Sequence, residues 1–412
     1  MFRGNSPLRD RRVALLVAGQ AVNAIGTWCA LVALWGYASF RFDAAPTQIA
    51  LLGLAWALPS VILGPIGGVP VDRFGPTRVL VVADSVAAGV AMLFIFAGSF
   101  EALIALAAVE GCTKAFAEPA FQSLPPRIVD NEHLAAANGL LALASQSAIA
   151  FGPLLAAGAI AWFGFDGAFV VNAVTYLIGV AVLVPFRIGA APRSGDATDR
   201  PGVRAEIREG VAVVAARPAL RWFMFLAGTV YLIWGAFIVV EPIYVREVLH
   251  GTPTTFALLQ TTFGVGLVAA GLLVTRLGDR VVRVSVVCIS AIGSGVGAMI
   301  YVGSGTAAVA FAGILLWGIV TGFLIAPLRT LVQRATPVAA HGRVFALDGT
   351  LHNTGDLFAL TIVGVIAAGA GVQVAGVAMA AVPIVGGLVT LWRFPTPARV
   401  LIPDQSTEPV AA

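Results

Sequence analysis

Charged side chains are scarce in this sequence of 412 residues. Aspartate, glutamate, lysine and arginine together make up 11% of the chain, whereas hydrophobic residues make up 59%. The mean hydropathy is +0.93. A soluble fold of this length could not hide so much apolar surface from water. The composition therefore excludes a soluble globular protein and predicts that lipid surrounds much of the chain.

Cysteine and histidine are also rare, with three and four copies. The cysteines fall inside long apolar stretches and show neither a disulfide framework nor a metal-ligand spacing. The sequence also lacks a Walker phosphate loop and a G-x-S-x-G nucleophile turn, which are typical of nucleotide-driven proteins and of serine hydrolases. We therefore expect no metal site, no cofactor and no enzymatic activity.

Twelve apolar segments are long enough to cross a bilayer, at about twenty residues per crossing. We predict the first six near residues 13–38, 46–70, 77–99, 102–124, 135–162 and 167–186. We predict the second six near residues 219–244, 254–275, 281–303, 306–328, 344–368 and 371–393. The predicted fold is an all-α membrane protein with twelve transmembrane helices in two six-helix bundles.

The two sets of helices define the predicted domains. We expect an N-terminal bundle over residues 1–187, a C-terminal bundle over residues 219–400 and a disordered cytoplasmic tail over residues 401–412. The linker, residues 188–218, begins with small and polar residues. Its second part carries valine and isoleucine at helical spacing over residues 203–214, which predicts an amphipathic helix on the inner membrane face.

The distribution of arginine predicts the orientation. Almost all arginines fall on one side of the predicted spans, and only Arg41 and Arg246 fall on the other. By the positive-inside rule, both termini are cytoplasmic. The same rule explains the pI of 9.3 without a nucleic-acid partner, because no basic patch is interleaved with aromatic residues. We expect a multi-pass, monomeric protein of a bacterial inner cell membrane, and a retained first helix in place of a cleaved signal peptide.

A dense charge cluster lies between the second and third spans, in the segment GGVPVDRFGPTRVL. Its spacing is G-x-x-x-D-R-x-G-x-x-R, with the members Gly68, Asp72, Arg73, Gly75 and Arg78. Glycines allow a tight turn and close helix approach, and an acid flanked by arginines can form ion pairs that hold one helix end against another. We interpret this segment as a cytoplasmic latch.

The charge cluster resembles the loop between the second and third helices of major facilitator superfamily transporters. One departure is Thr77, where the family usually has a basic residue. The acid–arginine pair of the loop recurs later as Asp279 and Arg280, which indicates duplicated six-helix units. The resemblance also implies that Asp84, in the third span, is a packing partner of the latch.

The fourth span carries Glu110, Lys114 and Glu118 at i, i+4 spacing, so all three share one helix face. A charge inside a bilayer costs roughly 2.5–3.5 kcal/mol even on lenient scales, which makes each a functional candidate. In the superfamily the fourth helix lines the central cavity. We expect Lys114 to neutralise one glutamate and leave the other, preferably Glu110, to exchange protons; the alternative is an ion-pair ladder that only fixes helix packing.

Polar side chains in two other spans are weaker candidates. In the first span, Gln20, Asn23 and Trp28 could form one wall of a ligand cavity, although small polar residues more often serve helix packing. In the eleventh span, a second titratable cluster places a histidine between two carboxylates, with the members Asp348, His352 and Asp356. Histidine suits proton exchange near neutral pH, and the alternative is a packing or gating role.

Three further charged residues, Glu241, Arg246 and Arg329, lie near predicted span ends, and we expect them at the membrane interface. In the fifth span, Gly139, Ala148, Gly152 and Pro153 follow the spacing of a glycine- and proline-rich motif, with alanine replacing some glycines. Small residues allow close helix approach, and proline bends a helix.

The fifth-span pattern resembles the antiporter motif of exporters in the superfamily. The segments ANGLLALASQSAIAFGP, FVVNAVTYLIGV and PIYVREVL resemble the drug:proton antiporter branch that contains macrolide-efflux proteins and enterobactin (siderophore) exporters. The resemblance implies proton-coupled multidrug-type efflux of a small amphipathic molecule, with substrate, protons and lipid as the partners. A proton-coupled importer or facilitator stays open, as does a protein of this fold that does not transport: an assembly factor, receptor or lipid scramblase.

Overall fold

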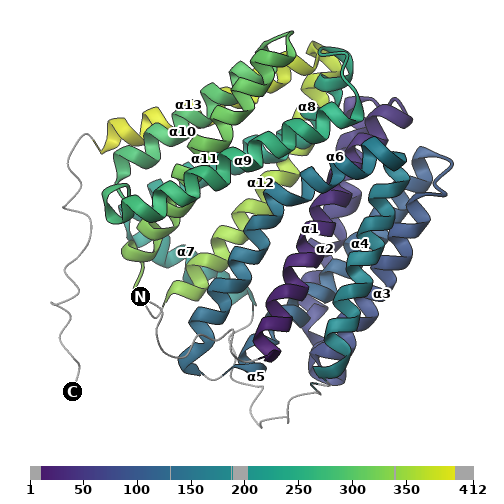
Figure 1. Ribbon diagram of the computed structural model, residues 1–412. Helices are drawn as coiled ribbons and strands as arrows, with labels where there is room; N and C mark the ends of the chain where they lie inside the picture. Colours follow the sequence, from purple (N-terminus) through teal and green to yellow (C-terminus); the bar gives the residue numbers. More distant parts are fainter. Residues whose placement is uncertain (1–10, 130, 187, 189–202, 338–339, 395–412) are drawn as a thin grey trace, which may run out of the picture. The chain divides into compact units, whose positions relative to one another are not determined.

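The structure is a computed structural model that describes residues 11–129, 131–186, 188, 203–337 and 340–394 (Figure 1). Ten helices in these ranges are long and apolar enough to cross a membrane. That count treats α6 as one helix although it contains two segments, and it leaves out α4, which carries several charged residues. With these two added, the structure has the twelve predicted spans, and the all-α membrane fold is confirmed.

The first half of the chain contains the elements α1 Arg11–Gly36, η2 Tyr37–Arg41, α2 Pro46–Phe74, α3 Pro76–Phe94, α4 Phe100–Gln122, α5 Pro125–Ile128, α6 Asn131–Leu183 and η3 Val184–Phe186. The second half contains α7 Val203–Ala216, α8 Pro218–Glu247, α9 Pro253–Leu277, η4 Gly278–Arg280, α10 Val284–Gly303, α11 Ala307–Ala335, α12 His341–Ala370 and α13 Val372–Arg393. The tail predicted over residues 401–412 lies outside the described residues.

The break inside α6 separates the fifth and sixth predicted spans. Gly164 has φ 69° and ψ −169°, so the helix is interrupted there. Positive φ is readily adopted by glycine because it has no Cβ. The exposed side chains of Trp162 and Phe163 precede the break, and aromatic residues of this kind are common at membrane interfaces. The sequence placed this break correctly between residues 162 and 167.

The chain divides into two compact units. Unit 1 contains residues 1–197, 238–264 and 360–373. Unit 2 contains residues 198–237, 265–359 and 374–412. The predicted bundles divide the chain once, at the linker, whereas unit 1 also includes two segments from the second half of the sequence.

In unit 1, α2, α3 and α4 pack side by side, and α1 packs along α6 (Figure 1). The approach of α2 to α4 depends on two glycines. A Cβ on Gly67 would lie 2.1 Å from the carbonyl oxygen of Ala115, and a Cβ on Gly111 would lie 2.3 Å from that of Trp56. Both distances are far shorter than van der Waals contact, so only glycine fits at either position. The predicted loop motif contains the neighbouring Gly68, whose Cβ position is open.

In unit 2, the predicted linker helix is observed as α7. Val214 is buried in an apolar core with residues of α8, α10, α11 and α12. Glu209 forms an ion pair with Arg343 at the start of α12, with 3.0 Å between the Arg343 Nε and the Glu209 carboxylate. Val211, predicted on the apolar stripe, is exposed. The helix is therefore attached to unit 2 by apolar packing in this core and by an ion pair with α12.

We predict that Gly67→Ala and Gly111→Ala each destabilise the protein, because each added methyl group would collide with a backbone carbonyl that cannot rotate away. The expected loss is about 1–3 kcal/mol, the usual cost of overpacking. Thermal unfolding in detergent, monitored by size-exclusion chromatography after heating, would show this loss of stability as a lower apparent melting temperature.

The matched control is Gly89→Ala on α3, where a Cβ meets no atom within 4 Å. This substitution should leave the melting temperature unchanged or raise it, since alanine is favoured over glycine in helices by roughly 0.5–1 kcal/mol. Equal melting temperatures for all three variants would refute the packing argument.

Candidate functional site

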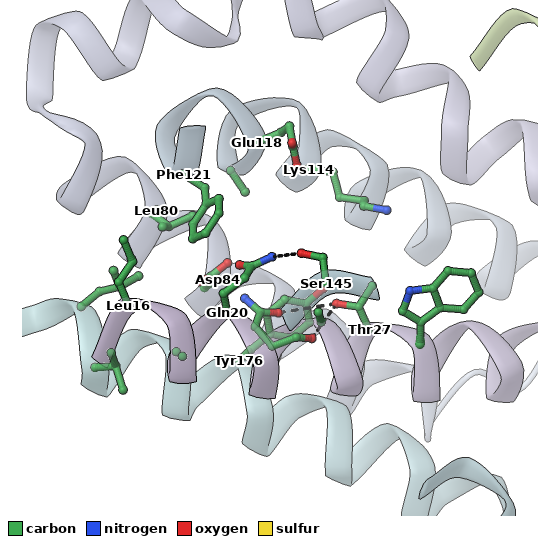
Figure 2. Close-up of a pocket in the computed structure, with 18 residues that line it drawn as sticks. Leu16, Gln20, Thr27, Leu80, Asp84, Lys114, Glu118, Phe121, Ser145 and Tyr176 are labelled. Atoms are coloured by element: carbon green, nitrogen blue, oxygen red, sulfur yellow. Dashed lines mark hydrogen bonds between the residues drawn. The ribbon is translucent and has the colours of Figure 1, made fainter. Parts of the chain in front are cut away.

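A cavity of about 220 Å³, with several polar side chains among its lining residues, lies inside unit 1, between α1, α3, α4 and both segments of α6 (Figure 2). Five of the six residues predicted for a substrate or proton cavity line it, namely Gln20, Asn23, Trp28, Lys114 and Glu118. Three further polar residues, not predicted for it from the sequence, also line it: Asp84, Ser145 and Tyr176. The cavity therefore unites side chains that are far apart in the sequence.

The polar side chains on the α1 side of the cavity are uncharged and form hydrogen bonds. The Gln20 Nε2 donates to the Ser145 Oγ at 3.1 Å, which connects α1 to the first segment of α6. The Thr27 hydroxyl donates to the Asn23 backbone carbonyl at 3.0 Å. Figure 2 shows Lys114 and Glu118 on the helix across the cavity from Gln20 and Thr27. The cavity thus has an uncharged wall on α1 and a charged wall on α4.

In the described residues, the charged side chains of α4 form no ion pairs with one another, neither the predicted pair of Lys114 with one glutamate nor the alternative ladder. Lys114 places its Nζ over the ring of Trp56, 3.5 Å from the centroid, in a cation–π contact. Glu118 is exposed and accepts a 2.7 Å hydrogen bond from Gln122 Nε2. Among the described residues, no carboxylate lies within ion-pair distance of Lys114. The lysine charge is instead stabilised by an aromatic ring of α2.

Glu110 lies behind the cavity wall. It is 5% exposed, and one carboxylate oxygen faces the Tyr176 hydroxyl at 3.5 Å. Tyr176, which lines the cavity, thus separates Glu110 from it. The segment FVVNAVTYLIGV could have indicated such a partner, because Tyr176 is a lone phenol in an apolar span.

Asp84 occupies a different place from the one expected for a partner of the latch. It is 3% exposed and lines the cavity, and its Oδ2 has no hydrogen-bond partner in the described part of the chain. A Cβ on Gly179 would lie 3.6 Å from both the Asp84 Oδ2 and the Asn23 Nδ2. Asp84 therefore belongs with the α1 and α6 residues of the cavity.

Unit 2 contains the second predicted cluster. The Tyr231 hydroxyl of α8 donates to Asp348 of α12, at 3.0 and 3.1 Å from the two carboxylate oxygens. The His352 ring stacks on Tyr231 with 4.3 Å between centroids, and its Nε2 lies 3.5 Å from Asp356 Oδ2. The edge of Trp234 also contacts the histidine. The three predicted residues share one face of α12, and α8 supplies two aromatic partners that the sequence did not reveal.

Glu241, expected at the membrane interface, is 5% exposed and accepts a hydrogen bond from Gln260 of α9. The helix α8 ends at Glu247, three residues beyond the predicted end at residue 244, so Glu241 lies farther from the helix end than expected. Arg246 lies in the last turn of α8 and pairs with Asp43 at 3.0 Å.

The predicted latch residues Asp72, Arg73 and Arg78 are exposed at the junction of α2 and α3. Gly75 ends α2 with φ 84°. Thr77 is buried, and its Oγ1 accepts a 3.2 Å hydrogen bond from the backbone nitrogen of Ile188. Thr77 thus connects this junction to the chain that follows the sixth span.

In the second copy of the latch, Asp279 pairs with Arg334 of α11. In the first copy, the acid Asp72 makes no ion pair with any described residue. Arg280, the other predicted member of the second copy, lies with Asp279 in η4.

The fifth-span motif lies in the first segment of α6 and contacts α1. A Cβ on Gly152 would lie 2.3 Å from the Trp28 Cβ, while Ala148 and Pro153 are buried. The Cβ position of Gly139 is open. The close approach of α6 to α1 therefore depends on Gly152, at the centre of the motif. Across the residues that the structure describes, no three His, Cys, Asp or Glu side chains gather as a metal site would require.

Several bacterial proteins are similar to this chain. One is the uncharacterized MFS-type transporter YfiS of Bacillus subtilis, at 24% identity over 91% of each chain. Macrolide efflux protein A of Streptococcus pyogenes is 24% identical over 66% of this chain and 68% of its own. The lysophospholipid transporter LplT of Serratia proteamaculans is 27% identical over 86% and 88%.

The fold is similar to that of the peptide transporter POT in a crystal structure with sulfate, with a TM-score of 0.72 and 13% identity over 93% of this chain and 94% of that one. The family model described as Major Facilitator Superfamily matches residues 16–239 and 223–410. Together these matches cover nearly the whole chain, and the protein belongs to the major facilitator superfamily of membrane transporters.

Proposed function

We propose that this protein exports a small amphipathic organic compound in exchange for protons, by secondary active transport. The observation that carries the proposal is the polar cavity of unit 1, where Asp84, Lys114 and Glu118 are gathered in an otherwise apolar bundle. Ionisable residues inside membrane segments are costly, and they typically mark substrate or proton pathways. Within a transporter family, such a cavity suits coupled transport.

Two features support export. Macrolide efflux protein A is among the similar proteins, and the motif around Gly152 and Pro153 resembles that of antiporters. The contact of Gly152 with Trp28 connects this motif to the cavity wall. We therefore propose that the fifth span and the first span move together during transport.

The proposed mechanism is alternating access, in which the bundles 1–187 and 219–400 rock about a central site. Both termini would lie in the cytoplasm, and the latch would stabilise one of the two states from that side. The exposed positions of Asp72, Arg73 and Arg78 leave their charges available for a partner in the other bundle.

A second candidate substrate class is a single-chain phospholipid. LplT, a lysophospholipid transporter, is similar over most of both chains. The outer face of α6 also carries an apolar groove of about 570 Å³, lined by residues that include Phe151, Leu155 and Trp162. Such a groove suits an acyl chain. Addition of lysophospholipid in the assay below would distinguish this class from lipophilic drugs.

We expect substrate-triggered proton movement in liposomes that contain the purified protein, and we expect Glu110→Gln to abolish it. Glutamine keeps the shape of the side chain and an oxygen for the Tyr176 hydroxyl, but it cannot exchange a proton. A fluorescent pH indicator inside the liposomes would measure the flux.

The control for this variant is Glu101→Gln, an exposed acid in the first turn of the same helix, which should retain the flux of the unmodified protein. Full proton-coupled transport by Glu110→Gln would remove Glu110 from the coupling site. Absence of flux in the folded, unmodified protein with every drug, siderophore, sugar and lipid tested would count against proton antiport itself.

We also expect Asp72→Asn to change the balance between inward- and outward-facing states, since the variant removes the only acid of the first latch copy. Spin labels on the two bundles would report the populations as distance distributions. Asp279→Asn should have a smaller effect, because Asp279 already pairs with Arg334 within unit 2. Unchanged distributions in Asp72→Asn would eliminate the latch.

A further inference from the structure

Asp84 is a buried acid without an assigned partner. Its side chain lies on α3 and is 3% exposed, its Oδ2 has no hydrogen-bond partner, and within the described ranges it takes part in no ion pair. A carboxylate in the interior of a bundle normally has several donors, because an unsatisfied buried charge is expensive. A purely structural role would leave this cost unexplained.

The surroundings of Asp84 supply few charges. On α1, the cavity is lined by neutral amides and hydroxyls such as Gln20 and Asn23. On α4, Lys114 and Glu118 line the same cavity, with the lysine Nζ held over Trp56. Glu110 lies behind the wall, and no titratable group of α2 lines the cavity.

On α6, the titratable group that lines the cavity together with Asp84 is Tyr176, whose hydroxyl lies 3.5 Å from Glu110. The remaining α6 lining residues are Ser145, Gly179, Val182 and Leu183. On α3 itself, the nearest charged residue along the chain is Arg78, which is exposed at the start of the helix. Of the two acids that line this cavity in the described residues, Asp84 is the buried one, and its Oδ2 has no donor there.

The cavity next to Asp84 has room for water. Its volume of about 220 Å³ is many times the roughly 10–15 Å³ that a single water molecule requires. Its polar walls offer hydrogen bonds to water. A proton could therefore reach the carboxylate from cavity water, and binding it would remove the uncompensated charge.

We propose that Asp84 is a proton-binding site of this transporter, separate from Glu110 and filled from the water of the unit 1 cavity. In the bound state, a proton is bonded to one carboxylate oxygen of Asp84, and on release it passes to cavity water. Tyr176 lines the cavity with Asp84 and faces Glu110, and we assign to it the coupling of the two acids. The assignment names a second proton site for the proposed proton antiport, and it rests on that proposed function.

The test is infrared difference spectroscopy of the full-length protein in lipid nanodiscs, between acidic and alkaline pH and without substrate. The carbonyl stretching band of a protonated carboxyl group reports each buried acid that takes up a proton. We expect Asp84→Asn to remove one component of this band, Glu110→Gln to leave that component in place, and Asp84→Glu to shift it.

Asp166→Asn is the matched control, because Asp166 is an exposed acid beyond the break in α6 and receives the same chemical change. It should leave the component intact. An Asp84→Asn spectrum identical to that of the unmodified protein would overturn the proposal, as would a band that responds to sodium concentration and not to pH. If Asp84→Asn does not fold, an unshifted band in Asp84→Glu would overturn it equally.

Transport by the same variants separates this assignment from the proposed function. Loss of substrate-triggered proton flux in Asp84→Asn, with substrate binding retained and the infrared component gone, would support both. An infrared component that depends on Asp84, in a protein that moves no protons with any substrate, would contradict antiport and retain the proton site. Normal coupled flux in Asp84→Asn would show that Asp84 carries no transported proton.

Discussion

The cost of placing a carboxylate away from water governs how this protein arranges its few charges. Near helix ends, acids pair with arginine, as in Asp43 with Arg246 in unit 1 and Asp279 with Arg334 in unit 2. Water reaches such positions, and ion pairs there are inexpensive to form. Farther inside the spans, the same acids would need a buried cation, whose desolvation often exceeds the gain from pairing.

Three of the acids inside the spans have neutral donors instead. Glu110 faces the hydroxyl of Tyr176, Asp348 accepts from Tyr231, and Glu241 accepts from Gln260. A phenol or an amide satisfies an oxygen without adding a charge. It therefore does not fix the carboxylate in its ionised form as a neighbouring arginine would. Such neutral donors occur in both units, on different helices.

Hydropathy and span length were enough to predict the twelve crossings, most of their bounds and the linker helix, because lipid imposes both the composition and the length of a span. Residues on one helix were also grouped correctly, since the i, i+4 spacing of Asp348, His352 and Asp356 is a property of that helix alone. Partners on other helices were not predictable. Lys114 contacts Trp56 and not its neighbouring glutamates, because the packing of α2 on α4 decides where the lysine points.

Two residues have surroundings that the sequence did not predict. Glu241 was expected at a span end, and α8 extends three residues beyond the predicted end. The resemblance implied that Asp84 packs against the loop between the second and third spans, and the structure places it in the lining of the cavity. In three dimensions, distance along the chain matters less than the helix face a residue occupies. Asp84 faces α1 and α6 across the cavity, where its neighbours are neutral amides and a phenol. Its Oδ2 has no hydrogen-bond partner among the described residues, so a bound proton would remove an uncompensated charge from the interior of unit 1.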